Sequence, residues 1–158
     1  MIKIVILTIS DSCANGDRAD ESGPAVRKLI CELPAEVIAY EIISDDLNLI
    51  RDKLCFYADN LNADLVLTCG GTGLSARDFT AQATRSVIEK EAPGIPELIR
   101  AEGVKKTRRA ALSCLVAGVR GKTLIINLPG SIKGATESLE AVIDILPHAR
   151  DMIAGKGH

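Results

Sequence analysis

Short apolar runs alternate with helix-like segments along this chain, and this alternation restricts the possible folds more than any other feature. Mainly apolar segments at residues 2–8, 36–43, 64–69 and 124–128 each have the length of a strand. Between them lie segments whose apolar residues recur every three or four positions, which is the spacing of one helix face. Strands that alternate with helices form a largely parallel sheet covered on both faces. The pattern therefore predicts an α/β fold.

The predicted helices carry start signals that fix where they begin. Ser22 is expected to cap the first helix, with Pro24 in its first turn. Ser44 or Asp45 is expected to cap the second helix, whose apolar face continues to Leu61. The remaining predicted helices cover residues 80–90, 96–102 and 135–153, the last of them bent at Pro147.

Composition excludes several classes of protein. The 158 residues suit a single domain spanning 1–158, and the net charge of -2 gives no bias toward nucleic acid or an anionic membrane. Two Phe, two Tyr and no Trp are too few for a base-stacking platform. No apolar run approaches the roughly 18 residues needed to cross a bilayer. Five widely spaced cysteines without a C-x-x-C motif indicate reduced thiols, so we expect a cytoplasmic protein.

Polar side chains and glycines gather where the predicted strands end. In open α/β sheets, ligands bind outside the carboxyl ends of the strands. The residues at these ends are Ser10, Asp11 and Ser12 after the first strand, Asp45 and Asp46 after the second, Gly70, Gly71, Thr72 and Gly73 after the third, and Asn127, Pro129, Gly130 and Ser131 around the last. Four such ends on one rim predict a binding site there.

The glycine run from Gly70 to Gly73 has two interpretations. It is a strand-to-helix turn that needs positive φ angles, or a loop whose N–H groups close on phosphate oxygens. It is not a Walker A loop, because no Gly-Lys-Ser/Thr ends it. Gly121-Lys122-Thr123 resembles the end of one, but it precedes a strand and is interpreted as a turn.

The acidic and basic residues near these ends also allow two readings. Asp45 and Asp78 either cap helices or hold Mg²⁺ together with substrate phosphates. The basic cluster at residues 105–109 is either a solvated loop or a contact for phosphate or a partner. Cys69 is interpreted as a buried thiol, since it follows an apolar strand with no histidine nearby in sequence.

Taken in order, the motifs resemble one known family. They are Thr8-Ile9-Ser10-Asp11-Ser12, Asp20-Glu21-Ser22-Gly23, Ser44-Asp45-Asp46, Gly70-Gly71-Thr72-Gly73 with Arg77-Asp78, Ala83-Thr84, Glu91-Ala92-Pro93-Gly94, Leu112-Ser113 and Asn127-Leu128-Pro129-Gly130-Ser131. The set is similar to the MoaB/Mog family of molybdenum cofactor biosynthesis proteins, which includes the G domain of gephyrin. The resemblance covers nearly the whole chain. At Asp11, Asp45 and Arg77-Asp78 the chain looks more like the Mog-type molybdopterin adenylyltransferases than like the MoaB branch.

This resemblance implies a fold, a reaction and an assembly. The fold would be a three-layer α/β/α domain with a mostly parallel mixed sheet, one strand being antiparallel, and the assembly a homotrimer. The reaction would be transfer of AMP from Mg-ATP to the terminal phosphate of molybdopterin, with release of pyrophosphate and hand-over of the product to a molybdate-insertion protein of the MoeA type. Two alternatives stay open: a non-catalytic molybdopterin-binding protein of the MoaB type, and a regulatory nucleotide binder without pterin chemistry.

The resemblance also assigns roles to residues. Asp45 and Asp78 would be the catalytic carboxylates that hold Mg²⁺. The residues expected to bind substrate or nucleotide are Ser10, Asp11, Ser12, Gly70, Gly71, Thr72, Gly73, Ser113, Asn127, Pro129 and Gly130. Three positions depart from the family pattern: Ala81, Cys114 and Ile132 stand where proline, arginine and proline are usual. The missing arginine would weaken phosphate binding unless Arg108 or Arg109 replaces its charge.

Overall fold

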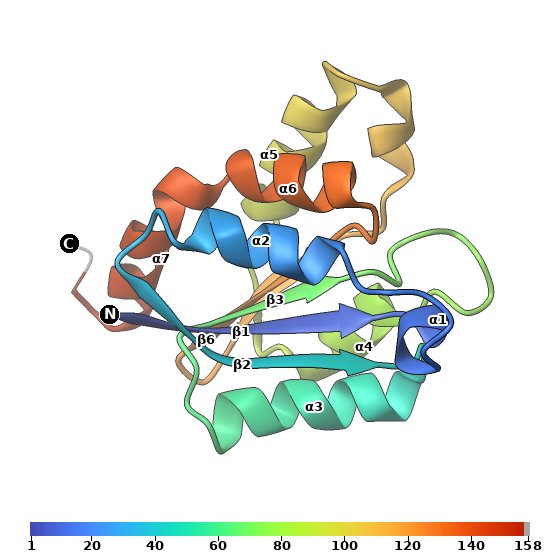
Figure 1. Ribbon diagram of the computed structural model, residues 1–158. Helices are drawn as coiled ribbons and strands as arrows, with labels where there is room; N and C mark the ends of the chain where they lie inside the picture. The colour runs from blue at the N-terminus through green and yellow to red at the C-terminus, as the bar shows by residue number, and fades with distance from the viewer. Residues whose placement is uncertain (157–158) are drawn as a thin grey trace.

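Six strands in residues 1–156, the part of the chain described by the computed structural model, form one sheet in the order β2-β1-β3-β6-β5-β4 (Figure 1). The strands are β1 (Ile2–Ile9), β2 (Ala35–Ile43), β3 (Leu65–Cys69), β4 (Lys90–Glu91), β5 (Ala117–Arg120) and β6 (Thr123–Leu128). Strand β5 runs antiparallel to both of its neighbours, whereas β2, β1, β3 and β6 pair in parallel. The expectation of a mostly parallel mixed sheet is confirmed.

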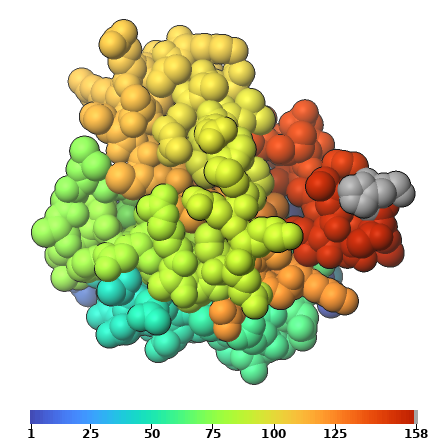
Figure 2. All heavy atoms as spheres, turned by 180° about the vertical axis from the view of Figure 1, so that it is seen from behind, coloured from blue at the N-terminus to red at the C-terminus, as the bar shows by residue number. Residues whose placement is uncertain are grey.

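Helices cover both faces of this sheet, which gives the expected three layers (Figure 1). The α-helices are α1 (Asp11–Ala14), α2 (Ser22–Ile30), α3 (Leu47–Asp59), α4 (Thr80–Val87), α5 (Gly94–Val104), α6 (Ile132–Glu140) and α7 (Leu146–Ile153), and the 3₁₀ helices are η1 (Arg108–Leu112) and η2 (Ile143–Ile145). Buried residues of α2, α5, α6 and α7 pack in one core cluster, and those of α3 and α4 in another. Seen from behind, α5 and η1 project as a lobe at the top of the molecule (Figure 2).

Strand β1 has apolar side chains on both faces of the sheet, and the helices on each face bury them. Ile4 and Ile6 are buried in the first core cluster, and Val5 and Leu7 in the second, with all four side chains 0% exposed. A strand covered on both faces reads as a continuous apolar run rather than an alternating one. None of the helices in residues 1–156 is both long and apolar enough to span a membrane.

Two of the predicted helix caps are wrong by one or two residues. Helix α3 is capped by Asp46, whose carboxylate accepts from the Leu49 N–H at 2.8 Å, and neither Ser44 nor Asp45 caps it. At α2, Asp20 Oδ1 accepts from the Gly23 N–H at 3.2 Å, and Ser22 is already the first helical residue. In both places a carboxylate reaches the free N–H groups of the first turn. Asp45 is therefore free for another role.

The single bent helix predicted over 135–153 is also wrong. The chain forms α6, η2 and α7, and Pro147 lies in the first turn of α7. A proline inside a helix clashes with the carbonyl four residues earlier, whereas the first turn tolerates it because its N–H groups have no helical acceptor. The α-helix therefore ends and restarts, and does not bend.

The sequence pattern does not predict β4 or β5, which have only two and four residues. Helix α4 ends at Val87, three residues before the predicted end, because Ile88 is extended and leads into β4. Gly121, with φ +57°, lies in the turn between β5 and β6, which confirms that Gly121-Lys122-Thr123 is not a phosphate loop.

Candidate active site at the ends of the parallel strands

A cavity of about 340 Å³ lies at the carboxyl ends of the parallel strands, where the sequence predicts a site. The expected residues in its wall are Ser10, Asp45, Gly70, Gly71, Asp78 and Gly130. They come from the ends of β1, β2, β3 and β6 and from the loop before α4. The sheet thus brings together residues that are up to 120 positions apart in the chain.

The glycine run follows β3 in a conformation that requires glycine. Gly70 has φ +108° and Gly71 φ +67°, the region that other residues rarely adopt. A Cβ atom at Gly70 would overlap the carbonyl oxygen of Ile9, and one at Gly71 would overlap Oγ1 of Thr80. The Thr80 hydroxyl in turn donates to the Gly70 carbonyl at 2.8 Å. The positive φ angles expected of a turn are therefore present, and the same glycines leave the cavity wall without side chains there.

Asp45 lies beside this loop and is joined to Asp11. The Asp11 N–H donates to Asp45 Oδ2 at 2.9 Å, and the Asp45 N–H donates to Asp11 Oδ1 at 3.0 Å. Arg77 donates from Nε to Asp11 Oδ2 at 2.8 Å and from Nη2 to Oδ1 at 3.1 Å. Nη2 also donates to the Asp45 carbonyl at 2.9 Å. Asp11 and Arg77 are not in the cavity wall.

The two proposed carboxylates differ in electrostatic environment. Burial raises the pKa of Asp45, and the negative charges of Asp11 and Asp78 raise it further, against the hydrogen bond from the Asp11 N–H and the charge of Arg77. Burial also acts to raise the pKa of Asp78, but hydrogen bonds from Ser75 and Gly73 outweigh it and leave that pKa below its usual value. Asp78 Oδ2 accepts from the Ser75 N–H at 2.9 Å and from its hydroxyl at 2.6 Å.

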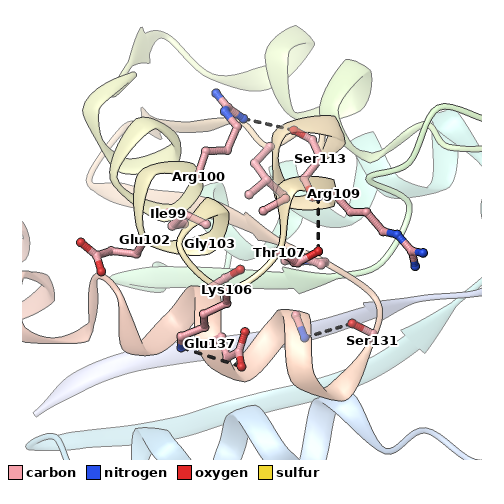
Figure 3. A pocket seen from close by; sticks show the side chains of 15 residues that line it. Ile99, Arg100, Glu102, Gly103, Lys106, Thr107, Arg109, Ser113, Ser131 and Glu137 are labelled. Carbon is pink, nitrogen blue, oxygen red and sulfur yellow. Dashed lines mark hydrogen bonds and ion pairs between the residues drawn. The ribbon is translucent and has the colours of Figure 1, made fainter.

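A second cavity, of about 210 Å³, adjoins the first between α5, η1 and α6 (Figure 3). Its wall includes three cationic side chains, Arg100, Lys106 and Arg109, and two acidic ones, Glu102 and Glu137. The expected residues Ser113 and Pro129 also line it. Arg100 Nη1 donates to the Ser113 carbonyl at 3.1 Å, and Lys106 Nζ lies 3.8 Å from Glu137 Oε1. Ser131, which caps α6, lines both cavities.

Several expected residues lie outside both cavity walls. Asn127 is 0% exposed, and its amide donates to Thr68 at 3.0 Å and Thr84 at 2.9 Å and accepts from the Val116 N–H at 3.1 Å. The polar atoms of Asn127 therefore hold β3, β6 and α4 together. The others outside the walls are Asp11, Ser12, Thr72 and Gly73.

The cavity wall also contains residues that the sequence analysis does not place in the site. Asp20 is the main one: its carboxylate accepts from Thr8 Oγ1 at 2.7 Å, from Ser22 and Gly23, and from the Tyr40 hydroxyl. Burial acts to raise its pKa, but these hydrogen bonds outweigh burial and lower it. The signal in the sequence is the Asp20-Glu21-Ser22-Gly23 motif, which supports the family resemblance but does not by itself assign Asp20 to the site.

Cys69 faces the same cavity but is not a reactive thiol. Its side chain is 1% exposed, and burial together with the nearby charge of Asp20 raises its pKa to about 12. The thiol is therefore protonated at neutral pH and is a poor nucleophile. This confirms the interpretation of Cys69 as a buried thiol.

The acidic groups suit a metal ion that arrives with a substrate. Within residues 1–156, no three Asp, Glu, His or Cys side chains cluster closely enough to hold a metal by themselves. Magnesium typically takes only one or two carboxylates, with the rest of its ligands from substrate phosphates and water. Asp45 and Asp78 supply that number of carboxylates in one cavity wall.

Residues 5–148 match the family of probable molybdopterin binding domains. The chain belongs to this family. The chain is similar to the crystal structure of the molybdopterin biosynthesis enzyme MoaB from Thermus thermophilus, with a TM-score of 0.94 and 51% sequence identity. The match covers 99% of this chain and 98% of that one. The α/β fold described above is therefore the fold of the family.

Curated relatives differ in how much of their length this domain occupies. Molybdopterin adenylyltransferase of Helicobacter pylori strain J99 is 42% identical over 157 residues, which are 98% of this chain and 89% of the relative. The Drosophila melanogaster molybdenum cofactor synthesis protein cinnamon is 41% identical over 149 residues, but the chain spans only 25% of its length. The family domain thus occurs both alone and as part of longer proteins.

Proposed function

We propose that this protein transfers AMP from Mg-ATP to the terminal phosphate of molybdopterin and releases pyrophosphate. The observation that carries the proposal is that Asp45, Asp78 and the Gly70-Gly71 turn form one cavity wall. This arrangement occurs in a chain that is 42% identical, over 98% of its length, to a molybdopterin adenylyltransferase. The activity of that relative is thus matched here by a site that suits it.

The reaction requires little covalent chemistry from the protein. An oxygen of the molybdopterin phosphate attacks the α-phosphorus of ATP, and the bond from that phosphorus to the bridging oxygen breaks. Pyrophosphate leaves with the electron pair. Because the attacking phosphate is already an anion, no Ser-His pair or strong base is needed, and catalysis rests on alignment and charge neutralisation.

The two cavities provide separate places for the two substrates. We place the ATP phosphates beside Gly70 and Gly71, where the absence of side chains allows close approach. We place the phosphate and pterin of molybdopterin in the second cavity, whose wall contains Ser113 and Arg109. The cavities meet at Ser131, so the two phosphates would approach each other there. Arg109 would supply the positive charge that Cys114 lacks.

Magnesium would be held by Asp45 and Asp78, and when bound it would neutralise charge on the ATP phosphates. Asp78 keeps a fixed orientation through Ser75, and Asp45 through the Asp11 N–H. Asn127 would act from behind the site by joining the strands that carry the glycine turn and the loop at Gly130.

The test is a transfer assay with matched aspartate variants. Purified protein is mixed with Mg-ATP and molybdopterin, and pyrophosphate and adenylylated molybdopterin are followed, the latter by mass spectrometry. We expect product from the wild type, and a loss of at least about 100-fold in Asp45→Asn and Asp78→Asn, the scale for groups that stabilise transition-state charge. Asp52→Asn, an exposed position on α3, is the control and should match the wild type.

Two outcomes of this assay would contradict the proposal. Full turnover by Asp78→Asn would remove Asp78 from the mechanism, and the absence of product from the wild type would remove the transferase activity. Light scattering of the same samples reports assembly: we propose a homotrimer, three times the chain mass of 16.8 kDa, that Asp78→Asn leaves intact. Hand-over of product to a molybdate-insertion protein is likewise a proposal.

A non-catalytic molybdopterin-binding protein is the second candidate. The observation in its favour is that residues 5–148 match a family described by binding alone, the probable molybdopterin binding domains. The paired carboxylates Asp45 and Asp78 in the cavity favour transfer, because a protein that only binds a pterin has no need of a metal-nucleotide site. Binding of molybdopterin without pyrophosphate release would favour this second candidate.

A further inference from the structure

We propose that Asp11 and Arg77 form a positioning pair that sets the spacing between Asp45 and Asp78. The inference rests on the proposed function, because it assigns a role within the same site. Strand β1 lies between β2 and β3 in the sheet, so the segments carrying Asp45 and Asp78 are separated by the end of β1. Asp11 follows β1 and is placed to join them.

On one side, Asp11 fixes the orientation of Asp45. Each of the two aspartates donates its backbone N–H to the carboxylate of the other, at 2.9 and 3.0 Å. The bond to Asp45 uses Oδ2, and Oδ1 is directed toward the glycine turn, where a Cβ atom on Gly71 would lie 3.4 Å away. One oxygen of Asp45 therefore holds it in place while the other faces the cavity.

On the other side, Asp11 holds the turn that carries Asp78. Arg77 precedes Asp78 in the sequence and donates two hydrogen bonds to the Asp11 carboxylate, at 2.8 and 3.1 Å. It also donates to the Asp45 carbonyl at 2.9 Å. Within the turn, the Asp78 N–H donates to the Ser75 carbonyl at 3.2 Å, and Ser75 donates twice to Asp78 Oδ2. The turn is thus a closed unit that Arg77 ties to the ends of β1 and β2.

The location of the pair supports positioning rather than direct contact with substrate. The side chains of Arg77 and Asp11 are 62% and 38% exposed, and neither is in the cavity wall that contains Asp45 and Asp78. Exposed ion pairs add little to the stability of a fold. A two-pronged contact at this place therefore matters for the geometry of the two carboxylates, as outer partners of metal-binding groups commonly do.

The chain contains a matched control pair. Arg120 makes the same two-pronged contact with Asp59, at 2.9 to 3.3 Å, and also donates to a backbone carbonyl, that of Val87, at 2.9 Å. This pair joins β5 to α3 at a distance from the proposed site, and neither residue lines its cavity. Loss of the Arg120 pair should have a similarly small effect on the stability of the fold and none on the site.

The experiment measures Mn²⁺ affinity by electron paramagnetic resonance, on protein saturated with α,β-methylene ATP, which cannot transfer AMP. We expect Asp11→Ala and Arg77→Ala each to weaken Mn²⁺ binding about 10- to 100-fold, the usual effect of losing an outer partner. The double variant should be no weaker than the weaker single variant, because the two residues act as one unit. Arg77→Lys keeps the charge but loses the fork, and should also bind weakly. Asp59→Ala and Arg120→Ala should match the wild type.

Four outcomes in the variants would overturn the proposed role of the pair. They are wild-type affinity in Asp11→Ala and Arg77→Ala, losses that add in the double variant, full affinity in Arg77→Lys, and equal losses in the Asp59 and Arg120 variants. A wild type that binds no Mn²⁺ with the nucleotide would also overturn it, since nothing would need positioning. Failure of the proposed function is distinguishable, because it appears as missing product in the transfer assay while Mn²⁺ affinity still depends on Asp11 and Arg77.

Discussion

Asp45 carries a negative charge in surroundings that disfavour it. Burial and the charges of Asp11 and Asp78 raise its pKa above the ordinary value of 3.8. Ionisation of a carboxyl group in such surroundings therefore lowers the stability of the folded state. Its backbone is nevertheless fixed, because the Ser10 N–H donates to the Ile43 carbonyl at 2.9 Å and the Asp45 N–H to Asp11. The fold therefore keeps Asp45 at a position where its ionised form is disfavoured, which is common in functional sites.

A stability prediction follows for Asp45→Asn. Because the pKa in the folded state is the higher one, the ionised carboxylate destabilises the fold at neutral pH, and this penalty disappears as pH falls below 3.8. We expect the variant to be about 0.5 kcal/mol more stable at pH 7, the scale of partly exposed charge interactions, and to lose that advantage in acid. Thermal unfolding across pH checks it; an advantage that grows in acid would contradict the argument.

At this scale the sequence predicts which residues gather but not how each is used. Ser44, Asp45 and Asp46 are consecutive polar residues, and any of them could cap a helix by composition. The register of β2 decides between them, because it places Asp46 before the first turn of α3 and Asp45 beside Asp11. Asn127 is the converse case: only the packing of β3, β6 and α4 shows that its amide is fully used.

At the scale of elements, α3 separates stability from function. Its cap is Asp46, which lines neither cavity, and the helix packs against the sheet through Ile50, Leu54 and Tyr57. Asp46→Ala should cost about 1 kcal/mol, the typical loss of a cap, and lower the melting temperature by about 2–4 °C. Asp46→Ser keeps a cap and serves as the control. Transfer activity per folded molecule should be unchanged, and a large loss of activity at unchanged stability would place Asp46 in the site.

The longer strands can be predicted from their apolar residues, whereas the short strands cannot. Strands β1, β2, β3 and β6 are each predicted to within about two residues, because a mainly apolar segment of strand length leaves few alternatives. Strands β4 and β5 have two and four residues, and they exist because they pair with each other at the edge next to β6. Their signal is the presence of a partner, which a local pattern does not contain.

At the scale of the whole molecule, the order of the strands in the sheet determines where the site lies. β2, β1, β3 and β6 are adjacent and parallel, so their carboxyl ends meet along one rim, whereas antiparallel β5 contributes its opposite end there. The sequence predicts that rim from four polar strand ends. It does not predict the second cavity, because that cavity forms between α5, η1 and α6, which only the fold brings together.

Two adjoining cavities predict that the folded protein gains stability from each substrate separately. At a ligand concentration 100 times the dissociation constant, binding adds about 2.7 kcal/mol, which for a chain of this length raises the melting temperature by about 5–10 °C. We expect molybdopterin and Mg²⁺ with α,β-methylene ATP each to give such a shift, and the two together to give a larger one. Thermal unfolding with each ligand alone and with both provides the measurement.

The pattern of these shifts also separates the alternative functions. A shift with molybdopterin but none with the nucleotide would favour the non-catalytic binder. A shift with the nucleotide but none with molybdopterin would favour a regulatory nucleotide binder. Because Asp45 and Asp78 face only the cavity proposed for ATP, Asp78→Asn should reduce the nucleotide shift and leave the molybdopterin shift intact. Loss of both shifts in that variant would mean that the cavities are one site.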